Sequence, residues 1–239
     1  MSVHRVQYAI PAVRVSIIIP TLNEEEHVVR AVESARATQA EEVIVVDGGS
    51  EDATRRLARQ SHATVVTAPA GRAVQQNAGV RACHGDVLLF LHADNWLDVS
   101  AVDQLRDAFR NERRLTTCFQ QEIIASGIRF RMLERGNAWR AKWLRLPYGD
   151  QGIAIRRSVF DRAGGFPEVP IMEDLLLMRK LGRISCPAVL AGPIYVSSRR
   201  WERNGVLRQT ITNWSLALAC RLGVSPQTLS RYYPRHSEP

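Results

Sequence analysis

The chain has 239 residues, of which 45% are hydrophobic and 23% charged, and this is the composition of a globular protein rather than a disordered one. Its net charge of +8 predicts attraction to phosphorylated ligands or anionic lipid. No nucleic-acid partner is expected, because the sequence has no lysine-rich tail and no RNA-binding motif of interleaved basic and aromatic residues. Four scattered cysteines without a C-x-x-C pair, no signal peptide and no apolar run of about 18 residues indicate a reduced, cytoplasmic protein.

The first part of the chain alternates short apolar segments with segments of helical composition. Strands are predicted at residues 15–20, 43–46, 63–66 and 87–91. Helices are predicted at about 24–37, 52–60 and 71–82, with Asn23 as the cap of the first. This alternation predicts an α/β fold with a mostly parallel sheet that is flanked by helices on both faces.

The second part of the chain is less regular. Extended segments are predicted at residues 115–125 and 152–156, and helices at 129–146, 158–163, 172–181 and 204–222. No internal repeat or linker separates the two parts, so we expect a single domain over residues 1–239, with halves at about 14–96 and 97–232.

Polar side chains follow three of the predicted strands at the point where each strand ends. Asn23 and Glu24 follow the first strand, Asp47 ends the second, and His92 and Asp94 follow the fourth. In open parallel sheets, ligands bind outside the carboxyl ends of the strands. The sequence therefore places its candidate site at this edge of the sheet.

Each of these residues also has a simpler interpretation. Asn23 and Glu24 have the composition of a helix start. Asp47 is compatible with an ordinary turn, and equally with accepting the imide N–H of a uracil. No glycine-rich loop follows the first strand, which argues against a dinucleotide-binding enzyme.

Three carboxylates are candidates for chemistry. Asp94 leaves a buried strand and suits Mg²⁺ or Mn²⁺, which bind one or two carboxylates together with substrate phosphates; it is also compatible with capping a helix near Val99. Glu173 and Asp174 begin a predicted helix, where acidic residues complement the helix dipole. One of the two is alternatively a general base for an acceptor hydroxyl.

Taken together and in order, these segments resemble family-2 glycosyltransferases of the GT-A fold. The resemblance extends from about Val15 to Tyr232. Its motifs are the segments 16–25, 45–54, 71–79, 85–94, 148–153, 164–167 and 172–175. Within the family, the chain is similar to a small, soluble bacterial subgroup with a His-Ala-Asp metal motif at 92–94 and a late segment at 199–205.

The resemblance implies a role for each matching residue. The first half would bind the nucleotide, through Pro20, Thr21, Asn23, Glu24, Asp47 (on the base), Arg72 (on the nucleotide or its phosphates) and Asn77. Asp94 and His92 would hold the metal, and Asp174, with Glu173 beside it, would act as the base. The acceptor and phosphate side would comprise Asp150, Gln151, Arg200 and Trp201.

The resemblance also implies the chemistry. A sugar would pass from a UDP- or GDP-sugar, with Mn²⁺ or Mg²⁺ as cofactor, to a small-molecule, lipid or glycan acceptor, with inversion at the anomeric carbon. His92 departs from the usual Asp-x-Asp, and an imidazole suits Mn²⁺ better than Mg²⁺ if it is a ligand at all; otherwise it orients ribose or phosphate. Ser197 replaces the glutamine of the processive Gln-x-x-Arg-Trp signature, which predicts a non-processive enzyme.

Two other functions remain open on the sequence. One is a catalytically weak protein that binds sugar nucleotides, favoured if the His92 variant of the motif binds no metal. The other is peripheral contact with an anionic membrane on the inner face of the cell membrane. Its contact face would comprise Arg131, Arg135, Trp139, Arg140 and Trp143. The donor sugar, the acceptor and the oligomeric state are not specified by the sequence.

Overall fold

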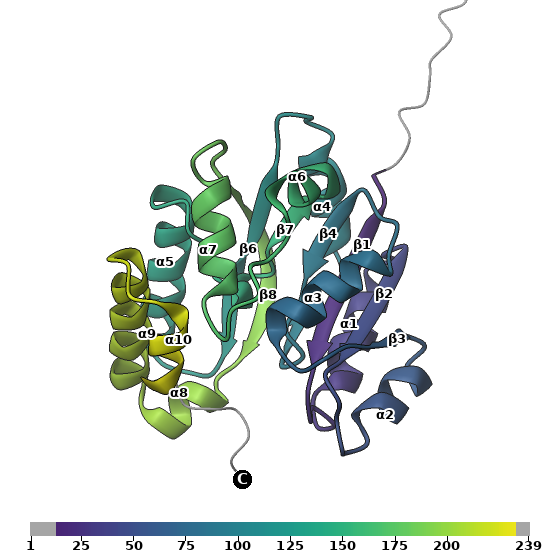
Figure 1. Cartoon of the computed structure of the whole chain (residues 1–239), viewed down its shortest axis with the longest axis horizontal. Coiled ribbons are helices and arrows are strands. Elements are labelled where there is room, and N and C mark those ends of the chain that lie inside the picture. The colour runs from purple at the N-terminus through teal and green to yellow at the C-terminus, as the bar shows by residue number, and fades with distance from the viewer. Residues whose placement is uncertain (1–12, 233–239) are drawn as a thin grey trace, which may run out of the picture.

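The computed structural model describes residues 13–232, apart from the side chains of Arg200, Arg203, Asn204 and Leu207. Within residues 13–232, one mixed sheet of eight strands has the order β3-β2-β1-β4-β7-β6-β8-β5 (Figure 1). The strands are β1 (Val15–Thr21), β2 (Glu42–Asp47), β3 (Thr64–Thr67), β4 (Val87–Phe90), β5 (Asn95–Leu97), β6 (Thr116–Ile124), β7 (Ala154–Arg156) and β8 (Ala188–Ser197).

Helices cover both faces of this sheet. They are α1 (Val28–Ala37), α2 (Thr54–Gln60), α3 (Arg72–Arg81), α4 (Ala101–Phe109), α5 (Ile128–Trp143), α6 (Arg157–Ala163), α7 (Glu173–Leu181), α8 (Arg199–Asn204), α9 (Val206–Arg221) and α10 (Pro226–Leu229), with 3₁₀ turns at Gly149–Gln151 and Ser230–Tyr232. None of the helices within residues 13–232 is long and apolar enough to cross a bilayer.

The first half of the sheet is parallel, as predicted. β1 pairs in parallel with β2 and β4, and β2 with β3. Successive side chains of a strand point to opposite faces. Ile17 and Ile19 therefore pack with residues of α1 and α4, whereas Ile18 packs with residues of α3, α6 and α7. The two apolar cores explain why β1 is an uninterrupted hydrophobic run rather than an alternating one.

The second half of the sheet contains both strand directions. β7 pairs antiparallel to β4 and to β6, β6 pairs in parallel with β8, and β5 pairs antiparallel to β8. β5 and β8 were not predicted from the sequence. β8 contains Gly192-Pro193, which is a turn signal in isolation. In the structure this pair is an irregularity within the strand: the register with β6 shifts there, and β8 pairs with β6 on either side of it.

The start of the first helix corrects the sequence prediction. α1 begins at Val28 rather than at Glu24, and Asn23 does not cap it. Asn23 has a φ of 54°, and its side-chain oxygen accepts the Glu51 N–H at 3.0 Å. Asn is one of the few residues that adopt this left-handed conformation at modest cost, so Asn23 turns the chain and joins two loops instead of starting a helix.

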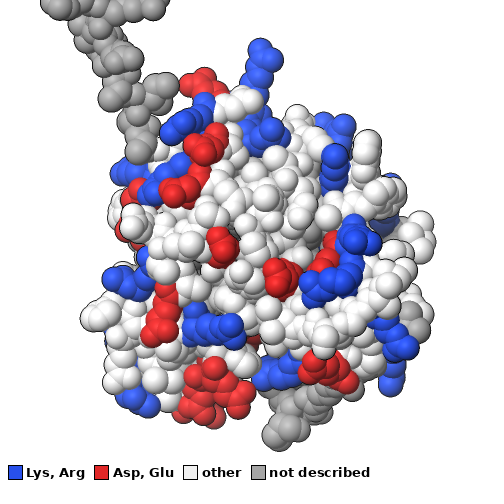
Figure 2. Space-filling model, turned by 180° about the vertical axis from the view of Figure 1, so that it is seen from behind, with Lys and Arg blue, Asp and Glu red and all other residues white. Residues whose placement is uncertain are grey.

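The basic excess does not gather on the rear face of the molecule. Figure 2 shows basic and acidic side chains interspersed over that face, with uncharged surface between them. Nucleic-acid binding usually depends on a clustered basic patch or stripe. This face therefore has no such feature.

Candidate functional site

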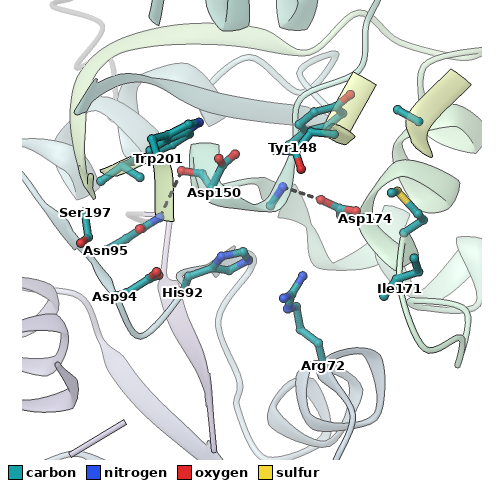
Figure 3. A pocket seen from close by; sticks show the side chains of 15 residues that line it. Arg72, His92, Asp94, Asn95, Tyr148, Asp150, Ile171, Asp174, Ser197 and Trp201 are labelled. Carbon is teal, nitrogen blue, oxygen red and sulfur yellow. Dashed lines mark hydrogen bonds between the residues drawn. The ribbon is translucent and has the colours of Figure 1, made fainter. Parts of the chain in front are cut away.

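A cavity lies where the carboxyl end of β4 meets α7, α8 and α9 (Figure 3). Elements from both halves of the chain line it. The polar lining residues are Arg72 (α3), His92, Asp94, Asn95, Tyr148, Asp150, Asp174 (α7), Ser197 (β8), Trp201 (α8) and Asn213 (α9). The structure therefore brings together four of the predicted site residues from the metal, phosphate and base sets, together with Asp150 and Trp201 from the acceptor set.

Asp94 and His92 follow β4 and both line the cavity. Within residues 13–232, no group of three or more His, Cys, Asp or Glu side chains is arranged to hold a metal ion. The chain thus does not build a metal cage of its own there. Asp94, with His92, instead fits a hard cation that completes its shell with substrate phosphates and water, as Mg²⁺ and Mn²⁺ do.

Gly149 lies between the two sides of the cavity. Its backbone N–H donates to Asp174 Oδ2 at 2.6 Å. A Cβ at this position would lie 2.8 Å from His92 Nε2 and 3.2 Å from Asp174 Oδ2. The absence of a side chain therefore lets both His92 and Asp174 approach Gly149 closely, a constraint that sequence analysis did not identify.

The two acidic residues at the start of α7 point to different places. Glu173 is 1% exposed, and its Oε1 lies 3.2 Å from Arg72 Nη1. Burial raises the pKa of Glu173, and the Arg72 guanidinium opposes that rise. Asp174 lines the cavity. Of the two carboxylates, Asp174 is thus the one placed to meet a ligand, while Glu173 positions Arg72.

Met172, immediately before this pair, has a left-handed backbone with φ of 67°. For a residue other than glycine this conformation costs of the order of 1–3 kcal/mol and is found mainly where the surroundings enforce it. Met172 also lines the cavity. The strained residue therefore sets the entry of the chain into α7 at the site itself.

Asp47 lies at the end of β2, outside the cavity lining. Its Oδ2 accepts the N–H groups of Gly49 and Ser50, both at 3.0 Å, so the turn interpretation is correct for this oxygen. Its Oδ1 is buried and has no hydrogen-bond partner within the described residues. Leaving a buried polar atom unbonded costs about 1–3 kcal/mol. Asp47 is therefore both a turn residue and an acceptor that lacks a donor.

The residues after β1 join two loops rather than line the cavity. Pro20 and Thr21 are the last residues of β1, and Thr21 is buried. The Asn23 N–H donates to Ser50 Oγ at 3.0 Å, and the Glu24 N–H donates to Thr54 Oγ1 at 2.8 Å. These bonds connect the β1–α1 loop to the β2–α2 loop beside Asp47.

Gln75 was missed by sequence analysis. Its Nε2 donates to the carbonyl oxygens of Thr21 at 2.7 Å and Val46 at 2.8 Å. The side chain thereby bridges the carboxyl ends of β1 and β2. A buried amide that bonds two strand ends leaves no sequence signal of its own, because it resembles any helical glutamine.

Two predicted site residues have structural contacts instead. Asn77 donates through Nδ2 to the Phe166 carbonyl at 2.9 Å and accepts the Phe166 N–H at 3.0 Å. Gln151 is wholly buried, and its Oε1 accepts from Arg140 at 2.8 Å and from the Tyr148 N–H at 3.1 Å. Neither lines the cavity, because each amide is used in fastening a backbone segment.

Trp201 and Arg200 complete the predicted acceptor side. Trp201 lines the cavity and is 7% exposed, and its Nε1 has no hydrogen-bond partner within residues 13–232. The side chain of Arg200 lies outside the described part of the chain. Asn95, which was not predicted, donates to the Asp150 carbonyl at 3.1 Å; its place directly after Asp94 was the only available signal.

Two of the five residues predicted for a membrane face on α5 have structural contacts, whereas Arg135, Trp139 and Trp143 are exposed. Arg140 is 7% exposed, lies 3.2 Å over the Tyr148 ring and donates to the Leu146 carbonyl. Arg131 donates to the carbonyls of Ile123 and Ala125. Both guanidiniums therefore bind the protein itself, because nearby loops offer carbonyls that a sequence cannot locate. Burial raises the pKa of the Tyr148 phenol, and the Arg140 guanidinium opposes this rise.

Comparison with known proteins identifies relatives of this arrangement. The family described as "Glycosyl transferase family 2" matches residues 16–167. The chain is 32% identical to chondroitin synthase of Escherichia coli over 113 residues, covering 44% of this chain and 16% of that protein. It is 26% identical to the probable glycosyltransferase YdaM of Bacillus subtilis over 190 residues, covering 67% of this chain and 44% of that protein. The chain thus spans less than half the length of these relatives.

Solved structures share the fold. Staphylococcus aureus TarS 1–349 in complex with UDP-GlcNAc has a TM-score of 0.63 at 17% identity, covering 77% of this chain and 58% of that one. Glucosyl-3-phosphoglycerate synthase from Mycobacterium tuberculosis, in complex with Mn²⁺, UDP and glucosyl-3-phosphoglycerate, has a TM-score of 0.59 at 20% identity, covering 89% and 81%. These likenesses confirm the predicted α/β, GT-A-type fold.

Proposed function

The chain belongs to glycosyl transferase family 2, and from that premise we propose that it transfers a sugar from a nucleoside diphosphate sugar to an acceptor hydroxyl with inversion. The observation that carries the proposal is the cavity itself. It joins Asp94 and His92 at the end of β4 to Arg72 and, on its other side, to Asp174. A candidate metal ligand, a cation for phosphate and a candidate base therefore face one space.

We take the donor to be a UDP-sugar, and Asp47 to bind the base. Its unbonded Oδ1 matches the imide N–H of uracil, which is a donor of the kind that this oxygen lacks. The neighbouring loops would flank the base through Pro20, Thr21, Asn23 and Glu24. Solved neighbours in complex with UDP-GlcNAc or UDP support this choice over a GDP-sugar.

Arg72 would bind the diphosphate, and Asp94 with His92 would hold Mn²⁺ or Mg²⁺. The contact with Glu173 fixes one side of the Arg72 guanidinium, which orients the group toward the cavity that it lines. When bound, the divalent cation supplies neutralisation of the negative charge on the leaving diphosphate. A solved neighbour in complex with Mn²⁺ and UDP supports the cofactor.

Asp174 would remove the acceptor proton. In the proposed step the acceptor oxygen bonds to the anomeric carbon, while the bond between that carbon and the diphosphate oxygen breaks. The proton passes to Asp174, and the electron pair leaves with the nucleoside diphosphate. The N–H of Gly149, which donates to Asp174 Oδ2, fixes the carboxylate in position. Attack opposite the leaving group inverts the anomeric centre.

The residue at position 197 bears on whether the enzyme releases its product after one transfer. Ser197 lines the cavity at the position where processive relatives are expected to carry glutamine, and Trp201 lies nearby in the same lining. We therefore propose a non-processive enzyme.

A thermal-shift experiment with UDP, UDP-GlcNAc and GDP, each with and without Mn²⁺, tests the donor site. A ligand at a hundred times its Kd stabilises by about 2.7 kcal/mol, which is a rise of roughly 5–10 °C for a chain of this size. We expect this rise for the uridine nucleotides with Mn²⁺, and its loss in Asp94→Asn.

Asp107→Asn is the matched control, because Asp107 is exposed on α4 and paired with Arg110 at the surface. It should shift as the unmodified protein does. Absence of any nucleotide response would contradict the proposed function. Binding without hydrolysis or transfer of the sugar would instead identify a catalytically weak nucleotide-sugar-binding protein.

A further inference from the structure

An apolar groove lies between α5, α7 and α9, beside the catalytic cavity. Its volume is about 560 Å³, within the usual range for ligand pockets of roughly 300–1,000 Å³. Trp139 of α5 forms one wall, and Ile211, Trp214 and Leu218 of α9 form the other. These four side chains are 55–64% exposed. Contiguous exposed apolar surface of this kind commonly marks a binding site.

The groove and the catalytic cavity share part of their walls. Tyr148 and Ala217 line both. On α9, Asn213 and Ala217 line the cavity, whereas Trp214 and Leu218 line the groove. Successive helical residues point about 100° apart. One side of α9 therefore faces the cavity, and an adjacent side faces the groove. The groove and the cavity are therefore adjacent, with Tyr148 and Ala217 at their common wall.

The charges of the groove all have one sign. Among the described residues, its charged lining residues are Arg140, Arg179 and Arg221, and no carboxylate of this part of the chain lines it. Arg140 is buried against Tyr148, whereas Arg179 and Arg221 are exposed. Apolar walls together with exposed guanidiniums complement a molecule that has both a hydrocarbon chain and an anionic group.

We propose that the sugar acceptor is such an amphipathic lipid. Its hydrocarbon chain lies in the groove between Trp139 and Trp214, its anionic group meets the arginines, and its hydroxyl reaches Asp174 past Tyr148 and Ala217. This inference rests on the proposed function and names the substrate class of the same site. The bond changes are those of the proposed transfer, with the lipid hydroxyl as the acceptor.

Binding of 11-(dansylamino)undecanoic acid, which has a long chain and a carboxylate, tests the groove without any transfer reaction. Binding is read from dansyl emission excited through the tryptophans. Each buried methylene strengthens binding about fourfold, so dansylglycine, which lacks the chain, should bind at least about a hundredfold more weakly. Saturating UDP with Mn²⁺ should leave the long-chain probe bound, because acceptor and donor occupy different spaces.

Two variants locate the probe. Leu218→Asp places a carboxylate in the groove and should weaken probe binding at least about tenfold, while UDP binding stays unchanged. Met132→Asp is the matched control, because Met132 is 65% exposed on α5 but does not line the groove. It should bind the probe as the unmodified chain does.

Several results would overturn the inference. One is an unchanged affinity of Leu218→Asp for the probe. Another is an equal loss of probe affinity in Met132→Asp, as expected for a general membrane-binding face. A third is displacement of the probe by UDP. Sedimentation of the probe-free protein as a dimer that Leu218→Asp dissociates would assign the groove to a second copy. Probe binding only after removal of residues 233–239 would assign it to the chain's own end. Failure of UDP to bind would contradict the proposed function. Binding of the probe in the groove could still be measured, because it does not require UDP.

Discussion

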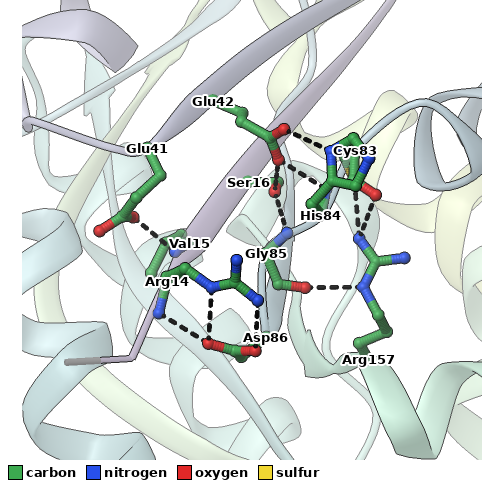
Figure 4. A network of polar contacts seen from close by, with 10 residues as sticks. All are labelled: Arg14, Val15, Ser16, Glu41, Glu42, Cys83, His84, Gly85, Asp86 and Arg157. Carbon is green, nitrogen blue, oxygen red and sulfur yellow. Dashed lines mark hydrogen bonds and ion pairs between the residues drawn. The ribbon is translucent and has the colours of Figure 1, made fainter. Parts of the chain in front are cut away.

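The two ends of the parallel strands use polar side chains differently. At the amino ends of β1, β2 and β4, the polar groups bond to one another (Figure 4). At the carboxyl end of β2 and in the segments that follow β4 and β8, the buried atoms Asp47 Oδ1, Asn95 Oδ1 and Trp201 Nε1 have no hydrogen-bond partner within residues 13–232. The cavity lies at this second end.

The network at the amino ends is closely fitted. The Ser16 hydroxyl donates to Glu42 at 2.5 Å and accepts the Gly85 N–H at 2.8 Å. A Cβ on Gly85 would lie 2.4 Å from Ser16 Oγ, so only glycine fits there. Arg14 donates to Asp86 through its backbone and its guanidinium. Each bond at this end joins two groups of the protein and therefore stabilises the fold.

The difference indicates which polar groups are available for a ligand. Most buried polar atoms in native proteins are hydrogen-bonded, and exceptions call for an explanation. Local conflicts of this kind concentrate at functional sites. Substitutions at the amino ends should therefore alter stability without altering nucleotide binding, and substitutions at the carboxyl ends should do the reverse.

The largest effect is expected at the carboxyl ends, from Asp174→Asn. Loss of a positioned base should lower the transfer rate by about 10²–10⁴-fold, which is roughly 3–5 kcal/mol of barrier. UDP affinity should be retained, because Asp174 serves the acceptor side. Steady-state kinetics of transfer, with calorimetry of UDP binding, provide the measurement.

The variant Glu173→Gln, at the adjacent carboxylate, is compared with Asp174→Asn in the same experiment. It weakens the contact with Arg72 and should raise the KM for the donor more than it lowers kcat. Full activity in Asp174→Asn with loss in Glu173→Gln would reverse the two roles. If both variants stay active, the base lies elsewhere, with Asp150 as the next candidate.

The largest stability effect is expected at the amino ends, from Arg157→Ala. The Arg157 guanidinium donates to the carbonyls of Val80, Cys83 and Gly85 at 2.7–3.2 Å. Hydrogen bonds to charged groups contribute about 1.5–3 kcal/mol, so the free energy of unfolding should fall by about 3 kcal/mol. Urea denaturation measures this loss, and an unchanged UDP affinity in the folded variant is the accompanying expectation.

A smaller effect at the same end depends on pH. Burial raises the pKa of Glu42, but hydrogen bonds from the His84 backbone, the Ser16 hydroxyl and the His84 ring outweigh it and lower the pKa to about 2. A carboxylate whose pKa is lowered in the folded state stabilises the fold at pH values above its ordinary pKa of 4.5. That stability is lost as pH falls from about 4.5 toward about 2.

Glu42→Gln should remove this part of the pH dependence. A pKa shift corresponds to about 1.36 kcal/mol per unit. Because the Glu42 side chain is 26% exposed, solvent screens part of this energy, and we expect Glu42 to contribute only about 1–2 kcal/mol to the free energy of unfolding. Denaturation curves between pH 6 and pH 3 compare the variant with the unmodified chain. Parallel pH profiles in the two proteins would refute the role of Glu42.

The smallest effect is expected from Trp201→Phe in the cavity. The indole N–H has no partner in the described structure, so its removal should leave stability unchanged or raise it by up to about 1 kcal/mol. If a ligand bonds this N–H, affinity for the acceptor or donor should fall several-fold. A loss of stability without any change in affinity would place Trp201 with the structural residues of the amino ends.

Much of the first half of the fold could be predicted because its signal is local. The apolar runs that became β1, β2 and β4 lie at the predicted places within two residues. Their order with the intervening helices indicates a parallel sheet and the edge at which ligands bind. The motifs carried by these strand ends were enough to identify the family, since each depends only on neighbouring residues.

What only the tertiary structure decided depends on residues far apart in the chain. Arg72 meets Glu173 across 101 positions, and Gly149 meets Asp174 across 25; together these contacts direct Asp174 to the cavity. The apolar residues of α7 could not make that choice, because they surround the helix.

Burial of Arg140 and the pairing of Asn77 with Phe166 were likewise invisible in the sequence. A side chain's type and spacing specify what it is able to bond, but the packing of distant segments specifies which partner it meets. The sequence thus determined the family, the core strands and the ligand edge. Tertiary packing decided which polar groups bind the protein, which face the cavity, and that an apolar groove adjoins it.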